Sequence, residues 1–155
     1  MITSVDFICR AFFEDRYPRP WEAAISIGDH DQKPPGVLHG YRHALRLQFL
    51  DVEPEECRKH DIPHEKTFQS KQAMKVAAFI RTLHDLPDKI DVVVHCEAGI
   101  SRSAAVASAV EAYSRCDRKE RDACYANKHV VRLLENELGV QISIPNPPAQ
   151  DDEAP

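Results

Sequence analysis

The chain lacks the features that mark membrane proteins, nucleic-acid-binding proteins and disulfide-stabilised proteins. No apolar segment in its 155 residues approaches the length of a membrane-spanning helix, and residues 1–6 lack the basic start of a signal peptide. Lys and Arg form no long run, and the formal net charge of −5 argues against a nucleic-acid partner. The five cysteines are an odd number without the spacing of a disulfide framework. We therefore expect a protein of a reducing compartment, the cytoplasm, with no membrane or nucleic-acid partner.

Apolar residues occur at both strand and helix spacing, which predicts a single α/β domain with a mostly parallel central sheet flanked by helices. We expect this domain to span residues 1–141. Residues 142–155, with four prolines and three acids, are expected to form a flexible tail.

The individual elements follow from the same patterns. Strands are predicted in residues 5–13, where the strand runs into a short helix, and in residues 23–27, 43–50 and 91–94. Residues 53–66 are expected to be a loop with one helical turn at 54–57. Thr67 is the expected N-cap of a helix with inward-facing Ala73, Val76, Ala77, Ile80 and Leu83. Further helices are predicted over 103–116 and over 119–126. A last helix is predicted from the N-cap Asn127 to a stop at Gly139, with Val130, Val131, Leu134 and Leu138 facing inward.

Residues 91–109 predict a buried strand, a short loop and a helix, with Cys96 where the strand ends. Ligands bind at this position in an open α/β sheet, and N–H groups at a helix N-terminus attract anions. Cys96 and Arg102 bracket five residues, enough for a loop whose N–H groups surround an anion. Arg102 would add a planar fork that suits two phosphate oxygens, and Ser103 would help to stabilise a Cys96 thiolate. A thiolate facing a bound phosphate is a nucleophile in attack position.

Residues 95–103, His-Cys-Glu-Ala-Gly-Ile-Ser-Arg-Ser, resemble the signature loop of the cysteine-dependent protein tyrosine phosphatases, especially their compact dual-specificity branch. None of the other four cysteines is followed by arginine six positions later. The resemblance implies a dual-specificity-phosphatase-like fold and a structural role for a buried, hydrogen-bonded His95. It also implies the site residues: Cys96 as nucleophile, Ser103 as the group that helps the thiolate leave, and Glu97, Ala98, Gly99, Ile100, Ser101 and Arg102 as the phosphate-binding loop.

The same family uses an upstream aspartate to protonate the leaving oxygen and then to activate water. Asp51 follows the predicted strand 43–50, as in the compact family members, and lies 45 residues before Cys96. Asp61 lies 35 residues before Cys96, which is closer to the separation usual in the family. We favour Asp51, because a loop insertion is tolerated whereas strand register is not readily shifted. The alternatives are Asp61, the nearby acids Glu53, Glu55 and Glu56, and a site with no general acid at all.

The predicted loop holds no Lys or Arg and carries Glu97, which disfavours polyanionic inositol phosphates as substrates. We expect a phosphorylated protein, with phosphotyrosine, or a small phosphomonoester. Cys57, His60 and His64 have a spacing that could suit a metal, but Pro63 interrupts them and no fourth ligand is evident, so we predict no metal and no organic cofactor. The alternative functions are a phosphate-binding protein that has lost turnover, and a rhodanese-like or arsenate-reducing enzyme with the same loop.

Overall fold

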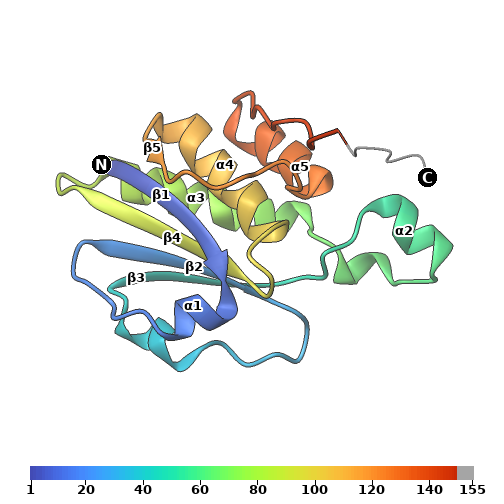
Figure 1. Ribbon diagram of the computed structural model, residues 1–155, viewed down its shortest axis with the longest axis horizontal. Coiled ribbons are helices and arrows are strands. Elements are labelled where there is room, and N and C mark those ends of the chain that lie inside the picture. The colour runs from blue at the N-terminus through green and yellow to red at the C-terminus, as the bar shows by residue number, and fades with distance from the viewer. Residues whose placement is uncertain (150–155) are drawn as a thin grey trace, which may run out of the picture.

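A five-stranded, all-parallel sheet with the strand order β3-β2-β4-β1-β5 forms the centre of the computed structural model (Figure 1). The structure describes residues 1–149. The strands are β1 (Ile2–Cys9), β2 (Glu22–Gly28), β3 (His43–Gln48), β4 (Ile90–Cys96) and β5 (Asp117–Arg118). Because every strand runs in the same direction, their carboxyl ends share one edge of the sheet, and Cys96 lies at that edge. The sheet is therefore fully parallel where the sequence predicted a mostly parallel one.

Helices flank this sheet on both faces (Figure 1). The helices are α1 (Arg10–Glu14), α2 (Pro54–Lys59), α3 (Ser70–Asp85), α4 (Arg102–Ser114) and α5 (Lys128–Leu138), with short 3-10 turns η1 (Gly36–Gly40) and η2 (His64–Lys66). Helices α3, α4 and α5 pack together on one face, where α4 contacts β1 and β4. Helix α1 and η1 contact each other, and α1 also contacts β1 and β4.

Two groups of buried side chains stabilise this arrangement. The larger group lies between the sheet and α3, α4 and α5, and it contains all of the inward-facing positions predicted for α3 and α5. Every residue from Arg102 to Val110 is buried, because the small side chains of α4 allow close packing against the sheet. The smaller group joins α1 and η1 to the sheet through Ile8, Phe13, Ala24, Leu38, Tyr41 and Val93.

Three of the local predictions were wrong. Thr67 does not cap α3; Gln69 does, in a reciprocal capping box with Gln72, while the Thr67 hydroxyl donates to the His64 carbonyl oxygen at 2.7 Å. The segment 119–126 is not helical, because β5 pairs with β1 and the Lys119 N–H donates to the Val5 carbonyl oxygen at 3.1 Å. The segment 53–66 is less of a loop than predicted, because α2 contains the predicted turn at 54–57 and continues to Lys59, and η2 forms a further turn.

The caps and stops of α5 were predicted correctly. Asn127 accepts a hydrogen bond from the Val130 N–H at 3.1 Å, and Gly139 ends the helix with a left-handed φ of 66°. Beyond this helix, Ile142 and Ile144 pack against the larger core, while residues 150–155 of the predicted tail lie outside the described residues. Within residues 1–149, no helix combines the length and the apolar character needed to cross a membrane.

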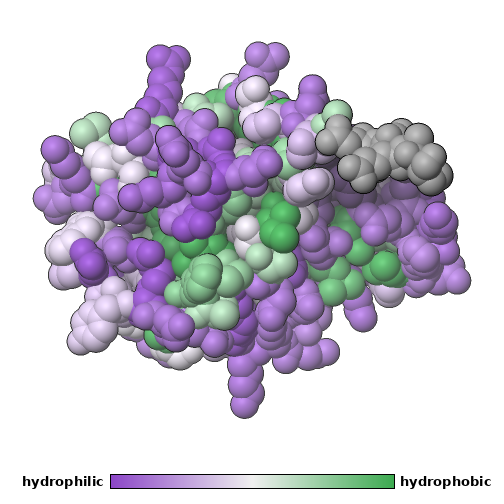
Figure 2. Space-filling model, in the orientation of Figure 1, coloured by the Kyte–Doolittle hydropathy of each residue, from purple (hydrophilic) through white to green (hydrophobic). Residues whose placement is uncertain are grey.

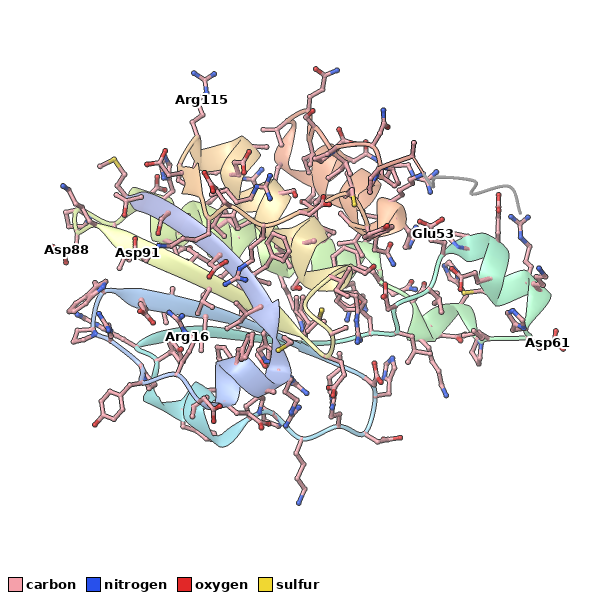
Figure 3. All side chains as sticks on the ribbon, in the orientation of Figure 1. Arg16, Glu53, Asp61, Asp88, Asp91 and Arg115 are labelled. Atoms are coloured by element: carbon pink, nitrogen blue, oxygen red, sulfur yellow. The ribbon has the colours of Figure 1, made fainter. Side chains whose placement is uncertain are left out.

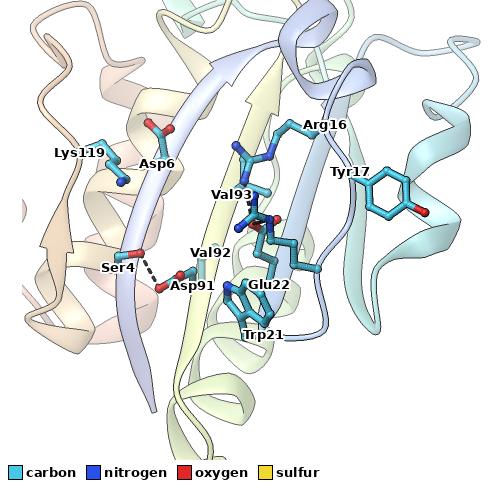
Figure 4. Close-up of a pocket in the computed structure, with 11 residues that line it drawn as sticks. Ser4, Asp6, Arg16, Tyr17, Trp21, Glu22, Asp91, Val92, Val93 and Lys119 are labelled. Carbon is cyan, nitrogen blue, oxygen red and sulfur yellow. Dashed lines mark hydrogen bonds and ion pairs between the residues drawn. The ribbon is translucent and has the colours of Figure 1, made fainter.

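The sheet face that carries α1 also has a polar hollow of about 440 Å³ (Figure 4). Within it, Arg16 Nη2 lies 3.1 Å from Glu22 Oε1, and Ser4 Oγ donates to Asp91 Oδ1 at 2.7 Å. Tyr17 lies at its margin and is exposed. None of the residues 95–103 lines this hollow, so it is separate from the loop that follows β4.

Candidate active site

Cys96 is the last residue of β4, and its side chain is directed into the loop that joins β4 to α4. The residue is 2% exposed. Its Sγ accepts a hydrogen bond from the Gly99 N–H at 3.2 Å and lies 3.1 Å from Ser103 Oγ, at the start of α4. An N–H group and a hydroxyl thus face the sulfur, and the contact with Ser103 is the one that the sequence predicted.

The backbone of residues 97–101 is fixed at its ends and at its centre. The Arg10 N–H donates to the Glu97 carbonyl oxygen at 3.1 Å, and the Ser101 carbonyl oxygen accepts from Ala105 and Asn127. Gly99 has φ +70°, and a Cβ there would lie 2.3 Å from the Cys9 nitrogen. Only glycine fits this close approach between the loop and the end of β1.

The remaining N–H groups of the loop are available for a ligand. In the described part of the chain, those of Ala98, Ile100 and Ser101 donate to no protein atom. They adjoin the N-terminus of α4, a helix of 13 residues whose first N–H groups also lack partners within the helix. A tight loop of free N–H groups beside a helix N-terminus binds anions such as phosphate.

Arg102 is held in the site by one edge of its guanidinium group. Its Nη1 donates to Asp29 Oδ1 and to the Phe49 carbonyl oxygen, both at 2.7 Å, and the side chain is 6% exposed. Its Nε is buried and has no hydrogen-bond partner within residues 1–149, and Nη2 donates to no described protein atom. Nε and Nη2 form the edge of the fork that binds two oxygens of a phosphate or carboxylate. This edge therefore has no protein partner within residues 1–149.

His95 is fully buried and neutral. Its Nδ1 lies 3.2 Å from the Cys96 carbonyl oxygen, which can only accept, so Nδ1 carries the proton. Its Nε2 then accepts from Ser26 Oγ at 2.6 Å, and Ser26 Oγ accepts from Arg46 Nη1 at 2.9 Å. Burial lowers the pKa of His95 to about 4, and the positive charges of Arg46 and Arg10 contribute to the decrease. His95 holds the end of β4 in place, as predicted.

Of the predicted acids, Asp51 lies beside the loop. Its Oδ1 accepts hydrogen bonds from Ser101 Oγ at 2.7 Å and from Asn127 Nδ2 at 2.9 Å. Asp51, Ser101 and Asn127 also line a hollow of about 300 Å³ with Tyr125. Asp51 Oδ2 takes part in no hydrogen bond within the described residues.

The other candidate acids have different surroundings. Asp61 is exposed, with φ 52°, in the turn after α2 at the end of the molecule remote from the loop (Figure 3). Glu53 accepts from the Lys128 N–H at 3.2 Å, and Glu55 and Glu56 lie in the first turn of α2. The structure therefore brings Asp51, and not Asp61, into contact with residues 97–103.

No known family, curated protein or solved structure matches this chain. The resemblance to the cysteine-dependent phosphatases therefore depends on residues 95–103 and on the geometry around them. Within residues 1–149, no group of three or more His, Cys, Asp or Glu side chains is arranged to hold a metal ion.

Sequence reasoning missed two of the residues that shape the site. Asp29 directly follows β2 and pairs with Arg102, although 73 positions separate them. The sequence does place Asp29 at the end of a strand, because residues 23–27 predict a strand that ends at Gly28 and Asp29. Asn127 was predicted only as a helix cap, but its Nδ2 also reaches Asp51. No local signal in the sequence indicates that second contact.

Proposed function

We propose that this protein is a phosphatase that hydrolyses phosphotyrosine-type phosphomonoesters through a phosphocysteine intermediate. The observation that carries the proposal is the free Nε edge of buried Arg102, in the same short loop as Cys96 Sγ. An unpartnered buried donor costs about 1–3 kcal/mol, and a phosphoryl group would satisfy it. The parallel sheet, the loop and α4 are consistent with a dual-specificity-phosphatase-like fold.

In the first step, the phosphoryl group binds to the free N–H groups of the loop and to Arg102 Nε and Nη2. The Cys96 thiolate attacks phosphorus, so that an S–P bond forms while the bond from phosphorus to the leaving oxygen breaks. Protonated Asp51 gives its proton to that oxygen through Oδ2, while Ser101 and Asn127 hold Oδ1. The products are the free alcohol or phenol and a phosphocysteine.

In the second step, water hydrolyses the phosphocysteine. Asp51, now a carboxylate, accepts a proton from the water as its oxygen attacks phosphorus. The S–P bond breaks and Cys96 leaves as a thiolate, which receives hydrogen bonds from Ser103 Oγ and the Gly99 N–H. Inorganic phosphate is released, and the next substrate finds the thiolate already formed.

The proposed substrate and compartment follow from the same chemistry. Glu97 belongs to the loop and is exposed, so its charge opposes substrates that carry several phosphate groups. A phosphorylated tyrosine side chain or a small aryl phosphate places a single phosphoryl group in the loop. A reactive thiolate is oxidised easily, which is consistent with a reducing cytoplasm.

The test is hydrolysis of para-nitrophenyl phosphate and of a phosphotyrosine peptide by wild-type protein, Cys96→Ser, Asp51→Asn and Asp61→Asn. Para-nitrophenolate leaves without protonation, whereas the tyrosine oxygen needs a proton. We expect Cys96→Ser to be inactive on both substrates and Asp51→Asn to lose about 100-fold or more in kcat/KM on the peptide, with a smaller loss on the aryl ester. Asp61→Asn is the matched control, and its kcat/KM should equal that of the wild type.

Two outcomes would contradict the proposal. Wild-type protein that binds vanadate but hydrolyses neither substrate would be a phosphate-binding protein without turnover. Turnover that survives Cys96→Ser would exclude the phosphocysteine intermediate. Sulfur-transfer and arsenate-reduction assays on the same preparation test the two other activities that a Cys-x5-Arg loop can support.

A further inference from the structure

A partly apolar groove of about 370 Å³ adjoins the loop on the side of β1 and β5, opposite to Asp51. Its apolar wall is formed by Phe7, Ile8, Phe12, Ala98 and Ile100. Figure 2 shows hydrophobic side chains gathered near the middle of this face, with hydrophilic side chains around them. The groove is distinct from the polar hollow at Arg16 and Glu22.

Two large apolar side chains at this groove are exposed to solvent. Phe12 is 64% exposed and Ile100 is 48% exposed. Phe12 points outward because the adjacent Phe13 is buried, where its ring stacks on His95 with a centroid distance of 4.3 Å. The packing of Phe13 therefore fixes the position of α1 and leaves the Phe12 ring on the surface, where a ligand can cover it.

The groove and the proposed phosphate site share part of the chain. Ala98, Gly99 and Ile100 line the groove and also belong to the loop around Cys96 Sγ. An extended peptide advances about 3.3 Å per residue, so a substrate with its phosphotyrosine in the loop would bring a residue one or two positions away to the groove. A small phosphomonoester would leave the groove empty.

The charges at the groove indicate what should accompany an apolar side chain. Its charged residues are Glu120, Arg121 and Asp122. Arg121 Nε donates to Asp6 Oδ1 at 2.6 Å, a contact that raises the pKa of Arg121 and neutralises its charge locally. Glu120 and Asp122 are exposed and form no ion pair in the described part of the chain. The remaining charge is therefore acidic, which favours a basic residue in the partner.

We propose that this groove is a substrate subsite that selects phosphotyrosine segments with a large apolar side chain one or two residues from the phosphotyrosine and a basic residue beside it. Phe12 is the specificity-determining residue. This inference rests on the proposed phosphatase activity, and it names phosphorylated protein segments, rather than small phosphomonoesters, as the substrate class.

The test uses phosphotyrosine peptides of alanine and glycine with a single leucine placed in turn at each of the two positions on either side. We expect leucine at one position to raise kcat/KM about tenfold over alanine, because partial burial of leucine against Phe12 contributes about 1.4 kcal/mol. Phe12→Ser should abolish this preference and leave para-nitrophenyl phosphate hydrolysis unchanged. Tyr17→Ser, which removes another exposed aromatic side chain at a different hollow, should retain the preference.

A separate comparison of peptides tests the preference for a basic residue. Lysine beside the preferred leucine should give a higher kcat/KM than glutamate, and the double variant Glu120→Gln, Asp122→Asn should reduce this difference. Equal kcat/KM values for all leucine positions, or a leucine preference that survives Phe12→Ser, would contradict the proposal that this groove is a substrate subsite. These results are distinguishable from failure of the proposed function, because para-nitrophenyl phosphate reports phosphatase activity without the groove.

Discussion

Arg102, the first residue of α4, and Asp29, in the loop after β2, form an ion pair of 2.7 Å at the carboxyl ends of the neighbouring strands β4 and β2. The Arg102 side chain is 6% exposed and the Asp29 side chain is 50% exposed, so the pair joins a buried guanidinium to a carboxylate at the surface. Asp29 and the Phe49 carbonyl oxygen hold Nη1 and thereby orient the free Nε edge. Asp29 is in this sense a positioning residue for the edge of Arg102 that is proposed to bind phosphate.

Replacing Asp29 by asparagine should lower kcat/KM on para-nitrophenyl phosphate about tenfold, because Arg102 loses a charge-assisted hydrogen bond that fixes its plane. Stability should change by less than about 1 kcal/mol, since Asp29 is half exposed. Asp31→Asn makes the same charge change in the same loop, and Asp31 forms no ion pair within residues 1–149, so the kcat/KM of this variant should match the wild type. Equal losses in both variants would show that the loop charge, and not the pair, matters.

The fold was predictable where the signals are local. The apolar spacing of α3 and α5, and the caps Asn127 and Gly139, lie within a few residues of the backbone they fix. The segment 119–126 was mispredicted because distant contacts override its helical composition. Arg121 pairs with Asp6, 115 positions away, and the Lys119 N–H donates to the Val5 carbonyl oxygen, so the start of this segment is held beside β1.

The same distinction applies to the candidate site. Cys96, Gly99 and Ser103 lie within eight consecutive residues, so their spacing alone predicts the loop around the sulfur. The contact of Asp51 with Ser101 spans 50 positions, and the sequence could only favour Asp51 over Asp61 from its place after a strand. The pairing of Asp29 with Arg102 requires the strand order, which a single sequence does not reveal.

Gly99 and Gly139 provide a matched test of the loop geometry, because both adopt left-handed φ angles. At Gly99 an alanine Cβ would lie 2.3 Å from the Cys9 nitrogen, whereas at Gly139 nothing lies within 4 Å. We expect Gly139→Ala to lower the free energy of unfolding by about 1 kcal/mol, and Gly99→Ala to lower it by about 3 kcal/mol and to abolish phosphatase activity. Urea denaturation measures both values. Similar decreases in the free energy of unfolding at the two positions would mean that Gly99 is not in close contact with the end of β1.

Ser103→Ala should slow the second chemical step more than the first. Its hydroxyl lies 3.1 Å from Cys96 Sγ and would stabilise the thiolate that leaves the phosphocysteine. Rapid mixing with para-nitrophenyl phosphate should therefore show a burst of one equivalent of product, followed by turnover about 10- to 100-fold slower than wild type. Ser108→Ala is the control, because its buried hydroxyl donates to the Ala104 carbonyl oxygen in the same helix. A Ser103→Ala enzyme without a burst would contradict this role.

His95 should make the protein less stable as the pH falls below neutrality. Its pKa is about 4 in the folded protein against 6.5 in an unfolded chain, so between these values only the unfolded chain binds the proton. The contribution of His95 to the free energy of unfolding is fully present above pH 6.5. It decreases by about 1.4 kcal/mol per pH unit down to about pH 4, a total of about 3 kcal/mol.

Urea denaturation of wild type and His95→Gln at about pH 7 and about pH 5 isolates this contribution, because the other titrating groups are common to both. The wild type should lose about 2 kcal/mol more than the variant between the two conditions. Parallel losses would mean that the ring takes up its proton while the protein is still folded, and the chain of hydrogen bonds from Arg46 through Ser26 would then have to accommodate a charged imidazole.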